Sequence, residues 1–292
     1  MATSTSPSTV GTRSITTRRV TFDHSDLTER HWLDGDLLES HLLAVLSAII
    51  PAGERFFAEA LRQARQDIDD PTLRSQANAF MGQELLHQRE HERFNEALAR
   101  VGYPTAVIDR TSQVLFAVLS RLPVRSQLAM TAAVEHWTAV IAEHALADPG
   151  FLDRDVPEET RAFLGWHLVE ELEHKAIAAD VLAEDGIGEA ERIAAMVFSI
   201  AVLIGPVLGG LALSLVTDPA SRSPRKVVRS LRRLPRTFFA RRSFRQDLVG
   251  YLRPGFHPDQ RDTSDLLELN RTALFGEDGS LTPRLAARAR AS

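Results

Sequence analysis

Two tetrapeptides of this chain place a glutamate and a histidine three residues apart, at Glu84–His87 and at Glu171–His174. A single glutamate precedes each copy, Glu54 by 30 residues and Glu135 by 36 residues. Two helices that carry Glu-x-x-His and two that carry a lone glutamate can hold two metal ions in the core of a four-helix bundle. The order of these residues therefore predicts a helical bundle with a dinuclear metal site.

The helical period brings one more histidine to the face of each motif. An α-helix turns by about 100° per residue, so His91 shares a face with His87, and His167 shares a face with Glu171. Carboxylates and imidazoles are costly to bury in a core unless they are paired or bound to a metal. For His91 the pattern leaves three roles open: a ligand, a neighbour that supports a ligand, or a surface residue. We expect the ligands to be Glu54, Glu84, His87, Glu135, His167, Glu171 and His174.

The types of donor atom limit the metals that such a site can bind. The chain has no cysteine, which excludes thiolate ligands and disulfides. Carboxylate oxygen and imidazole nitrogen favour iron, manganese or zinc over iron–sulfur clusters. Four carboxylates roughly neutralise two divalent ions and so offset the cost of burying them. We expect two divalent metal ions, with iron as the first choice and manganese or zinc as alternatives. Glu143 and His144 lie on the same expected helix as Glu135 and leave the choice of ligand there open.

Apolar residues recur at helical spacing, and no segment shows the alternation of a strand, so the fold class is all-α. Pro51 and Gly53 predict an interruption in the first long helix. The helices are expected at about 36–66, 71–100, 109–120, 124–147 and 157–183.

The last third of the chain has a different composition. Residues 194–216 contain no charge, and residues 222–245 carry ten basic residues and no acidic one. The apolar run is long enough to span a bilayer. Gly205-Pro206 and Gly209-Gly210 interrupt it, however, so we expect two short apolar helices that cover the bundle or line a lipophilic pocket. A peripheral membrane contact through residues 194–245 is the second interpretation, and a true span is the third.

These patterns divide the chain into four parts. We expect a disordered tail at 1–22, the metal-binding bundle at 23–186, apolar helices with a basic segment at 187–250, and a loop-rich tail at 251–292. The net charge of −5 argues against general nucleic-acid binding. We expect a cytoplasmic protein that acts on a small-molecule substrate, with membrane association and a homodimer left open.

The residues around the motifs resemble a bacterial, ferritin-like family described as predicted metal-dependent hydrolases. The likeness spans roughly residues 30–260, and its matching segments are 31–33, 46–57, 82–91, 135–139, 166–181 and 256–258. It implies a ferritin-like four-helix bundle with extra apolar C-terminal helices. It also implies hydrolysis by a metal-bound water.

The spacing of His167, Glu171 and His174 is also similar to that in di-iron arylamine N-oxygenases, where an extra histidine on the last bundle helix completes the site. This second likeness implies oxygen chemistry. Carboxylate-rich bundle sites with few histidines are typical of di-iron and di-manganese proteins. We therefore expect O2-dependent oxidation or oxygenation of a small or lipophilic organic substrate. Metal-dependent hydrolysis is the alternative, and a non-enzymatic metal-binding ferritin-like protein is the second alternative.

Overall fold

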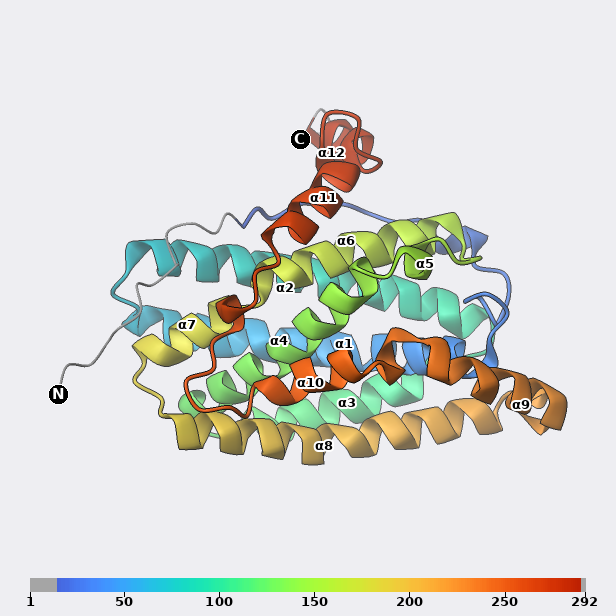
Figure 1. Cartoon of the computed structure of the whole chain (residues 1–292), viewed down its shortest axis with the longest axis horizontal. Helices are drawn as coiled ribbons and strands as arrows, with labels where there is room; N and C mark the ends of the chain where they lie inside the picture. Colours follow the sequence, from blue (N-terminus) through green and yellow to red (C-terminus); the bar gives the residue numbers. More distant parts are fainter. Residues whose placement is uncertain (1–14, 290–292) are drawn as a thin grey trace.

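The computed structural model describes residues 15–289, which form helices joined by turns and extended segments (Figure 1). None of these residues belongs to a strand. The prediction of an all-α protein is therefore confirmed.

Four long helices form the centre of the molecule: α1 (Leu37–Ala64), α2 (Pro71–Arg100), α4 (Val124–Leu146) and α6 (Glu158–His174). Helix α1 packs along α2 and α4, and α6 packs along α4 and α2. The Asp36 side chain caps α1 by accepting a hydrogen bond from the backbone N–H of Glu39. Asp70 caps α2 in the same way, and Pro71 occupies the first turn, where no N–H is needed. Each of these four helices carries part of the expected metal site.

The expected interruption at Pro51 and Gly53 is absent, and α1 runs through both residues as one helix. A proline inside a helix leaves the carbonyl four residues earlier without its N–H donor. Here that carbonyl belongs to Ser47, and the side-chain amide of Asn95 donates to it at 3.0 Å. A side chain from the neighbouring helix thus replaces the missing backbone hydrogen bond, which is why α1 stays continuous.

The expected fourth helix is divided in two. Helix α6 ends at His174, and α7 (Ile177–Glu184) begins after a turn at Lys175 and Ala176. The remaining helix of this region, α3 (Thr105–Leu119), starts slightly earlier than expected, and a short α5 (Pro149–Leu152) lies between α4 and α6.

The charge-free run forms one continuous helix, α8 (Glu189–Val216), and the prediction of two short helices is wrong. Pro206 lies inside the helix. A Cβ atom on Gly210 would approach Cγ1 of Val45 to 2.8 Å, so the glycine allows α8 to pack closely on α1. Packing against neighbouring helices outweighs the low helix propensity of this segment.

Two helical segments are long and apolar enough to cross a membrane, judged by length and composition alone: residues 37–67 and 189–216. In the most apolar part of the first, 67% of the residues are buried in the core, whereas only 17% are buried in the second.

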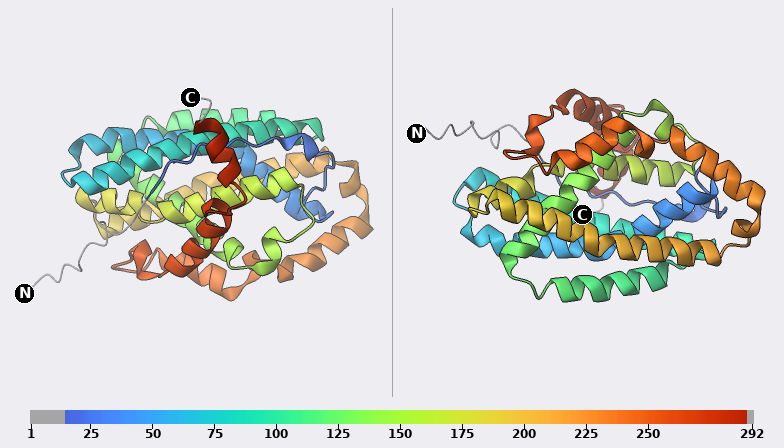
Figure 2. Two further views of the ribbon diagram at one scale, coloured as in Figure 1. Left: turned by 90° about the horizontal axis from the view of Figure 1, so that it is seen from above. Right: turned by 60° about the horizontal axis from the view of Figure 1, so that its bottom comes forward.

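The chain after α8 is more helical than expected. The basic segment forms α9 (Pro224–Arg233) and α10 (Arg242–Gly250), and α10 packs on α4. The expected loop-rich tail contains α11 (Ser264–Phe275), which packs on α6, and α12 (Thr282–Ala289). Viewed from above, α11 and α12 cross over the central helices (Figure 2, left).

The N-terminal segment is packed against the helices from residue 15 onward. Val20 and Phe22 are fully buried, and Arg18 is 8% exposed. The expectation of a disordered tail therefore fails for residues 15–22, because apolar and ion-paired side chains hold them in place. Residues 1–14 of that expected tail lie outside the described part of the chain.

Candidate metal centre

The four central helices bring the expected ligands together. Glu54 comes from α1, Glu84 and His87 from α2, Glu135 from α4, and His167, Glu171 and His174 from α6. Each of these residues is at most 8% exposed. On one side, Nδ1 of His174 lies 3.0 Å from Oε1 of Glu84 and 3.7 Å from Oε2 of Glu135. On the other side, Nδ1 of His87 lies 3.4 Å from Oε1 of Glu171 and 3.9 Å from Oε1 of Glu54.

The ligand atoms fall into two overlapping groups that could each hold a metal ion. One group is Glu54, His87, His167 and Glu171, and the other is Glu84, His87, Glu171 and His174. Within each group the atoms lie within 4.8 Å of one another. Glu171 and His87 belong to both groups. The carboxylate of Glu171 has two oxygens to offer, whereas His87 has one free nitrogen and can bind only one of the two ions. The arrangement could therefore hold two adjacent ions, with Glu135 available next to His174.

Several buried polar atoms at this point lack a hydrogen bond of acceptable geometry within residues 15–289. They are both carboxylate oxygens of Glu54, one oxygen each of Glu84, Glu135 and Glu171, and Nδ1 of His87 and of His174. A buried polar atom without a partner costs about 1–3 kcal/mol, so such atoms are rarely gathered in one place without a reason. All of them are carboxylate oxygens or imidazole nitrogens, which are ligand atoms suited to divalent metal ions. The residues present thus fit the two metal ions expected from the sequence.

The outward nitrogens of two site histidines are held by neighbouring side chains. Nε2 of His87 lies 3.1 Å from Oε2 of Glu170, and Nε2 of His174 lies 3.0 Å from Oε1 of Gln83. A hydrogen bond at one ring nitrogen fixes the tautomer and leaves the other nitrogen for a metal. In both residues the remaining nitrogen is the Nδ1 atom that faces the centre.

His91 is buried behind His167 and belongs to neither ligand group. Its Nε2 lies 2.6 Å from Nδ1 of His167, and its Nδ1 lies 2.9 Å from Oγ of Ser47. Ser47 in turn donates to Asn95 at 2.8 Å. Of the three roles left open for His91, this geometry favours the support of a ligand, because the contact orients Nε2 of His167 towards Glu171 at 2.8 Å.

Sequence reasoning missed Arg18, a buried cation that pairs with two glutamates next to the ligands; we call it the Arg18 brace. Arg18 donates to Glu173 at 2.9 and 2.8 Å and to Glu170 at 3.2 Å. Glu170 contacts His87, so Arg18 reaches a candidate ligand through one intervening carboxylate. The only signal was the unusual density of glutamates around His174, which requires a compensating charge if the face is buried. The segment that supplies the charge lay in the expected disordered tail.

Burial and mutual repulsion change the protonation of the carboxylates in the absence of a metal. Burial, followed by repulsion from Glu84, raises the pKa of Glu54 well above its ordinary value and the pKa of Glu135 to about 8. Burial alone would lower the pKa of His87, but hydrogen bonds to Glu170 and Glu171 raise it to about 9. The metal-free centre thus holds protons near neutral pH, and a bound cation would replace them.

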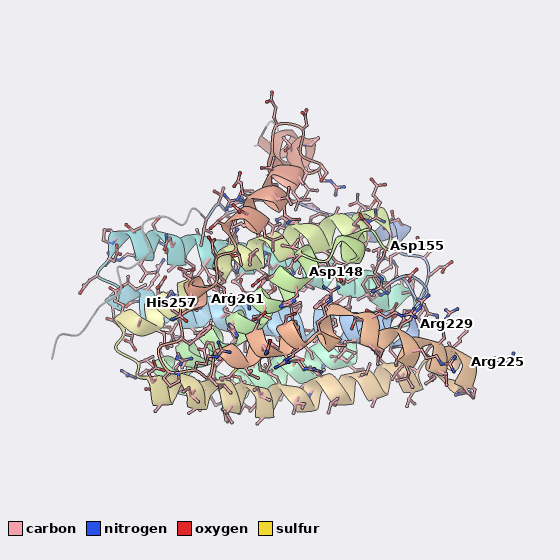
Figure 3. All side chains as sticks on the ribbon, viewed as in Figure 1. Asp148, Asp155, Arg225, Arg229, His257 and Arg261 are labelled. Carbon is pink, nitrogen blue, oxygen red and sulfur yellow. The ribbon has the colours of Figure 1, made fainter. Side chains whose placement is uncertain are left out.

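Glu143 and His144, the alternatives to Glu135 as a ligand from α4, lie away from the metal centre. Nε2 of His144 bonds to Oδ2 of Asp247 at 2.8 Å, and Glu143 forms an ion pair with Arg261. Figure 3 marks Arg261 between α7 and α10, and Arg261 also pairs with Asp247 of α10. Neither residue belongs to a ligand group at the centre, so Glu135 is the glutamate of α4 that faces the site.

Residues 16–262 match the model of a protein family described as "Predicted metal-dependent hydrolase". The match includes every candidate ligand, the Arg18 brace and helix α8. The corresponding searches find no match among curated proteins or solved structures. Because the family model covers most of the chain, the protein belongs to the family of predicted metal-dependent hydrolases.

Proposed function

We propose that this protein is a ferritin-like, dinuclear-metal enzyme that uses two iron ions for the O2-dependent oxidation or oxygenation of a small or lipophilic organic substrate. The observation that carries the proposal is the ligand set. The two candidate ion groups contain three carboxylates and three imidazoles, with Glu171 and His87 in both groups, and Glu135 adds a fourth carboxylate beside His174. Such carboxylate-rich helical sites are typical of di-iron and di-manganese proteins. Bound iron would supply the electrons that reduction of dioxygen requires, which zinc cannot do.

The surroundings of the ligands are suited to a reaction from which water is excluded. The ring of Phe80 lies 4.6 Å from that of His174, and the ring of Trp166 lies 4.8 Å from that of His87. Both aromatic residues are fully buried. With no ligand more than 8% exposed, a small reactant such as dioxygen can reach the centre more easily than a bulky ester.

The protein's own residues would hold and orient the ions. Gln83 and Glu170 fix the outward nitrogens of His174 and His87, and His91 fixes that of His167. Rigid ligands impose their geometry on a metal, and the groups behind them raise their basicity. Burial raises the pKa of Glu54 well above its ordinary value and that of Glu135 to about 8, and bound ions would favour the charged form of both carboxylates.

Metal-dependent hydrolysis is the second candidate, and family membership is the observation that favours it. Hydrolysis needs no redox change, so a zinc form would be fully active. A non-enzymatic metal-binding protein would bind iron without turnover of an organic substrate.

Metal replacement separates these functions. We expect two iron ions per chain in natively purified protein, and dioxygen uptake when the anaerobic ferrous protein is exposed to oxygen. The zinc form and the E84Q variant should take up none, and the matched control E92Q, an exposed glutamate two turns further along α2, should behave as wild type. Full activity of the zinc form on ester or amide substrates, without oxygen uptake by the ferrous form, would overturn the proposal in favour of hydrolysis.

A further inference from the structure

Helix α8 carries many large apolar side chains on its outer face, although Val202, Leu203 and Val207 pack against the core. The buried residues of α8 are Arg192, Met196, Ser199, Gly210 and Ser214, which are mostly small or polar. The outer face has Ile204 at 53% exposure and Leu208 at 58%. A helix at the surface of a water-soluble domain normally has the opposite arrangement, with its apolar stripe facing the core. The outer face of α8 is therefore built to contact something that is not water.

Helix α3 extends this apolar surface. It packs beside α8, and both helices lie on the same side of the molecule (Figure 2, right). Val107, Val114 and Val118 of α3 are each more than half exposed. A groove of about 380 Å³ is lined by residues of both helices, with Val107 on one wall and Leu213 on the other. Contiguous apolar surfaces of this kind mark interaction sites. We call this surface the α3–α8 face.

A cluster of arginines lies at the end of the molecule where α8 finishes. Five arginines and Val228 line a hollow of about 480 Å³ on and after α9. Figure 3 labels two of them, Arg225 and Arg229, at the end of the molecule where α8 finishes. Arg225, Arg232 and Arg236 have no acidic partner in the part of the chain that the structure describes. We call Arg225, Arg229, Arg232, Arg233 and Arg236 the arginine hollow.

We propose that the α3–α8 face docks onto an anionic lipid bilayer, with α8 lying in the plane of the interface and the arginine hollow binding lipid phosphates. An apolar helix face next to clustered basic residues is the combination that binds anionic membrane surfaces. Each guanidinium group can also form two parallel hydrogen bonds to the oxygens of one phosphate, so several arginines around one hollow suit a phosphate ligand.

Both ends of α8 are fixed to the rest of the protein, which argues for a helix in the interface rather than a span. At its C-terminal end, Oδ2 of Asp218 lies 2.8 Å from Nε2 of His31 and 2.9 Å from Nε2 of His41. At its N-terminal end, Arg192 lies over the ring of Tyr251 at 4.7 Å and donates to backbone carbonyls of the segment after α10. A span would have to break these contacts and uncover α1 and α4.

A second copy of the chain would satisfy the arginines less well than lipid phosphate. The acidic residues on the two helices of the face are Asp109 on α3 and Glu189 and Glu191 at the start of α8. Asp109 accepts a hydrogen bond from Gln113 at 2.8 Å on its own helix. Glu189 already accepts from Arg192 at 2.7 Å, and Glu191 accepts from Arg125 at 3.2 Å. Charge complementarity therefore favours the anionic bilayer.

Site-specific fluorescence tests the position of α8, because the chain has no cysteine of its own. Leu208→Cys on α8 and the control Leu269→Cys on α11, which is 70% exposed, would each carry an environment-sensitive dye on the full-length protein. With vesicles of phosphatidylcholine and phosphatidylglycerol, we expect a blue shift and quenching by brominated lipid for the dye at 208 and no change for the dye at 269. No response at position 208, or the same response at both positions, would overturn the proposal.

Charge variants test the arginine hollow by sedimentation with the same vesicles. Each basic residue near an anionic surface strengthens binding about fivefold, so R225Q/R232Q should bind about 25-fold more weakly. The control R19Q/R161Q removes the same charge from exposed arginines of the N-terminal segment and α6. These two elements lie on the opposite side of the molecule from α8 (Figure 1), so binding should stay within about twofold of wild type because salt screens distant charges. Equal losses in the two double variants would contradict the assignment.

Light scattering without lipid tests for the alternative occupant. We expect the oligomeric state of I204Q/L208Q to match that of wild type and its vesicle binding to fall. A wild-type dimer that this variant converts to a monomer, with unchanged vesicle binding, would identify a second copy as the occupant and overturn the bilayer proposal.

Discussion

Replacing Glu135 with glutamine should stabilise the metal-free protein while weakening its affinity for metal. Burial raises the pKa of Glu135 to about 8 from an ordinary value of 4.5, so the folded metal-free protein must hold a proton that the unfolded chain releases. At about pH 7 this difference costs about 3 kcal/mol of folding free energy. Glutamine has a similar shape and no proton to hold, so E135Q should recover most of that free energy.

The effect has a defined dependence on pH. Below its ordinary pKa, Glu135 is protonated in both the folded and the unfolded protein and costs no folding free energy. Because the folded-state pKa is raised, stability is lost as pH rises from about 4.5 towards about 8. The advantage of E135Q should therefore be small near pH 5 and should grow up to about pH 8. For a chain of this size, about 3 kcal/mol corresponds to an increase in Tm of about 5 °C.

Thermal unfolding followed by circular dichroism, on chelator-treated protein across this pH range, measures the effect. Added ferrous or zinc ions should then raise the Tm of wild type well above that of E135Q, because a bound ion stabilises only the folded state. The control E92Q should follow wild type in both conditions. A metal-free E135Q that is less stable than wild type at about pH 7, or that gains as much stability from metal, would refute this reasoning.

Three further substitutions test the supports of the fold and the site. H91A removes the group that orients His167, so metal affinity, measured by competition with a chelator, should fall by about 10- to 100-fold; unchanged affinity would show that His167 needs no support. R18A leaves Glu170 and Glu173 buried without this cation and should lower the free energy of unfolding in urea by about 3 kcal/mol, whereas a loss no larger than that of the exposed control R19A would argue against the brace. G210A forces a Cβ atom against Val45 and should cost about 1–3 kcal/mol, while G209A, which meets open space, should be neutral or stabilising; equal effects would contradict the close packing of α8 on α1.

The parts of the fold that could be predicted from the sequence are those encoded locally. The bounds predicted for α2, residues 71–100, are those of the structure, because Asp70 and Pro71 mark its start and Gly102 its end. The clustering of the two Glu-x-x-His motifs with Glu54 and Glu135 also follows from helical period and order along the chain.

The features that could not be predicted depend on contacts between distant residues. Pro51 is tolerated because Asn95 donates to the carbonyl of Ser47, and nothing near residue 51 encodes that hydrogen bond. The close packing of α8 on α1 depends on Gly210, which fits against Val45 in another helix. Arg18 was missed because its partners lie more than 150 residues away and its own segment is polar and rich in threonine.

That separation of 152 residues between Arg18 and Glu170 has a consequence for how the chain matures during synthesis. A growing chain emerges at about 5–20 residues per second, so Arg18 leaves the ribosome roughly 8–30 seconds before its partners. During that interval α1, α2 and α4 can offer Glu54, Glu84, His87 and Glu135, but the shared carboxylate of Glu171 and two of the three imidazoles are still missing. An ion captured at that stage would meet an incomplete, carboxylate-dominated ligand set. Selection among metals by the full site can begin only after α6 has been made. Arg18 can pair with Glu170 and Glu173 only from that point on.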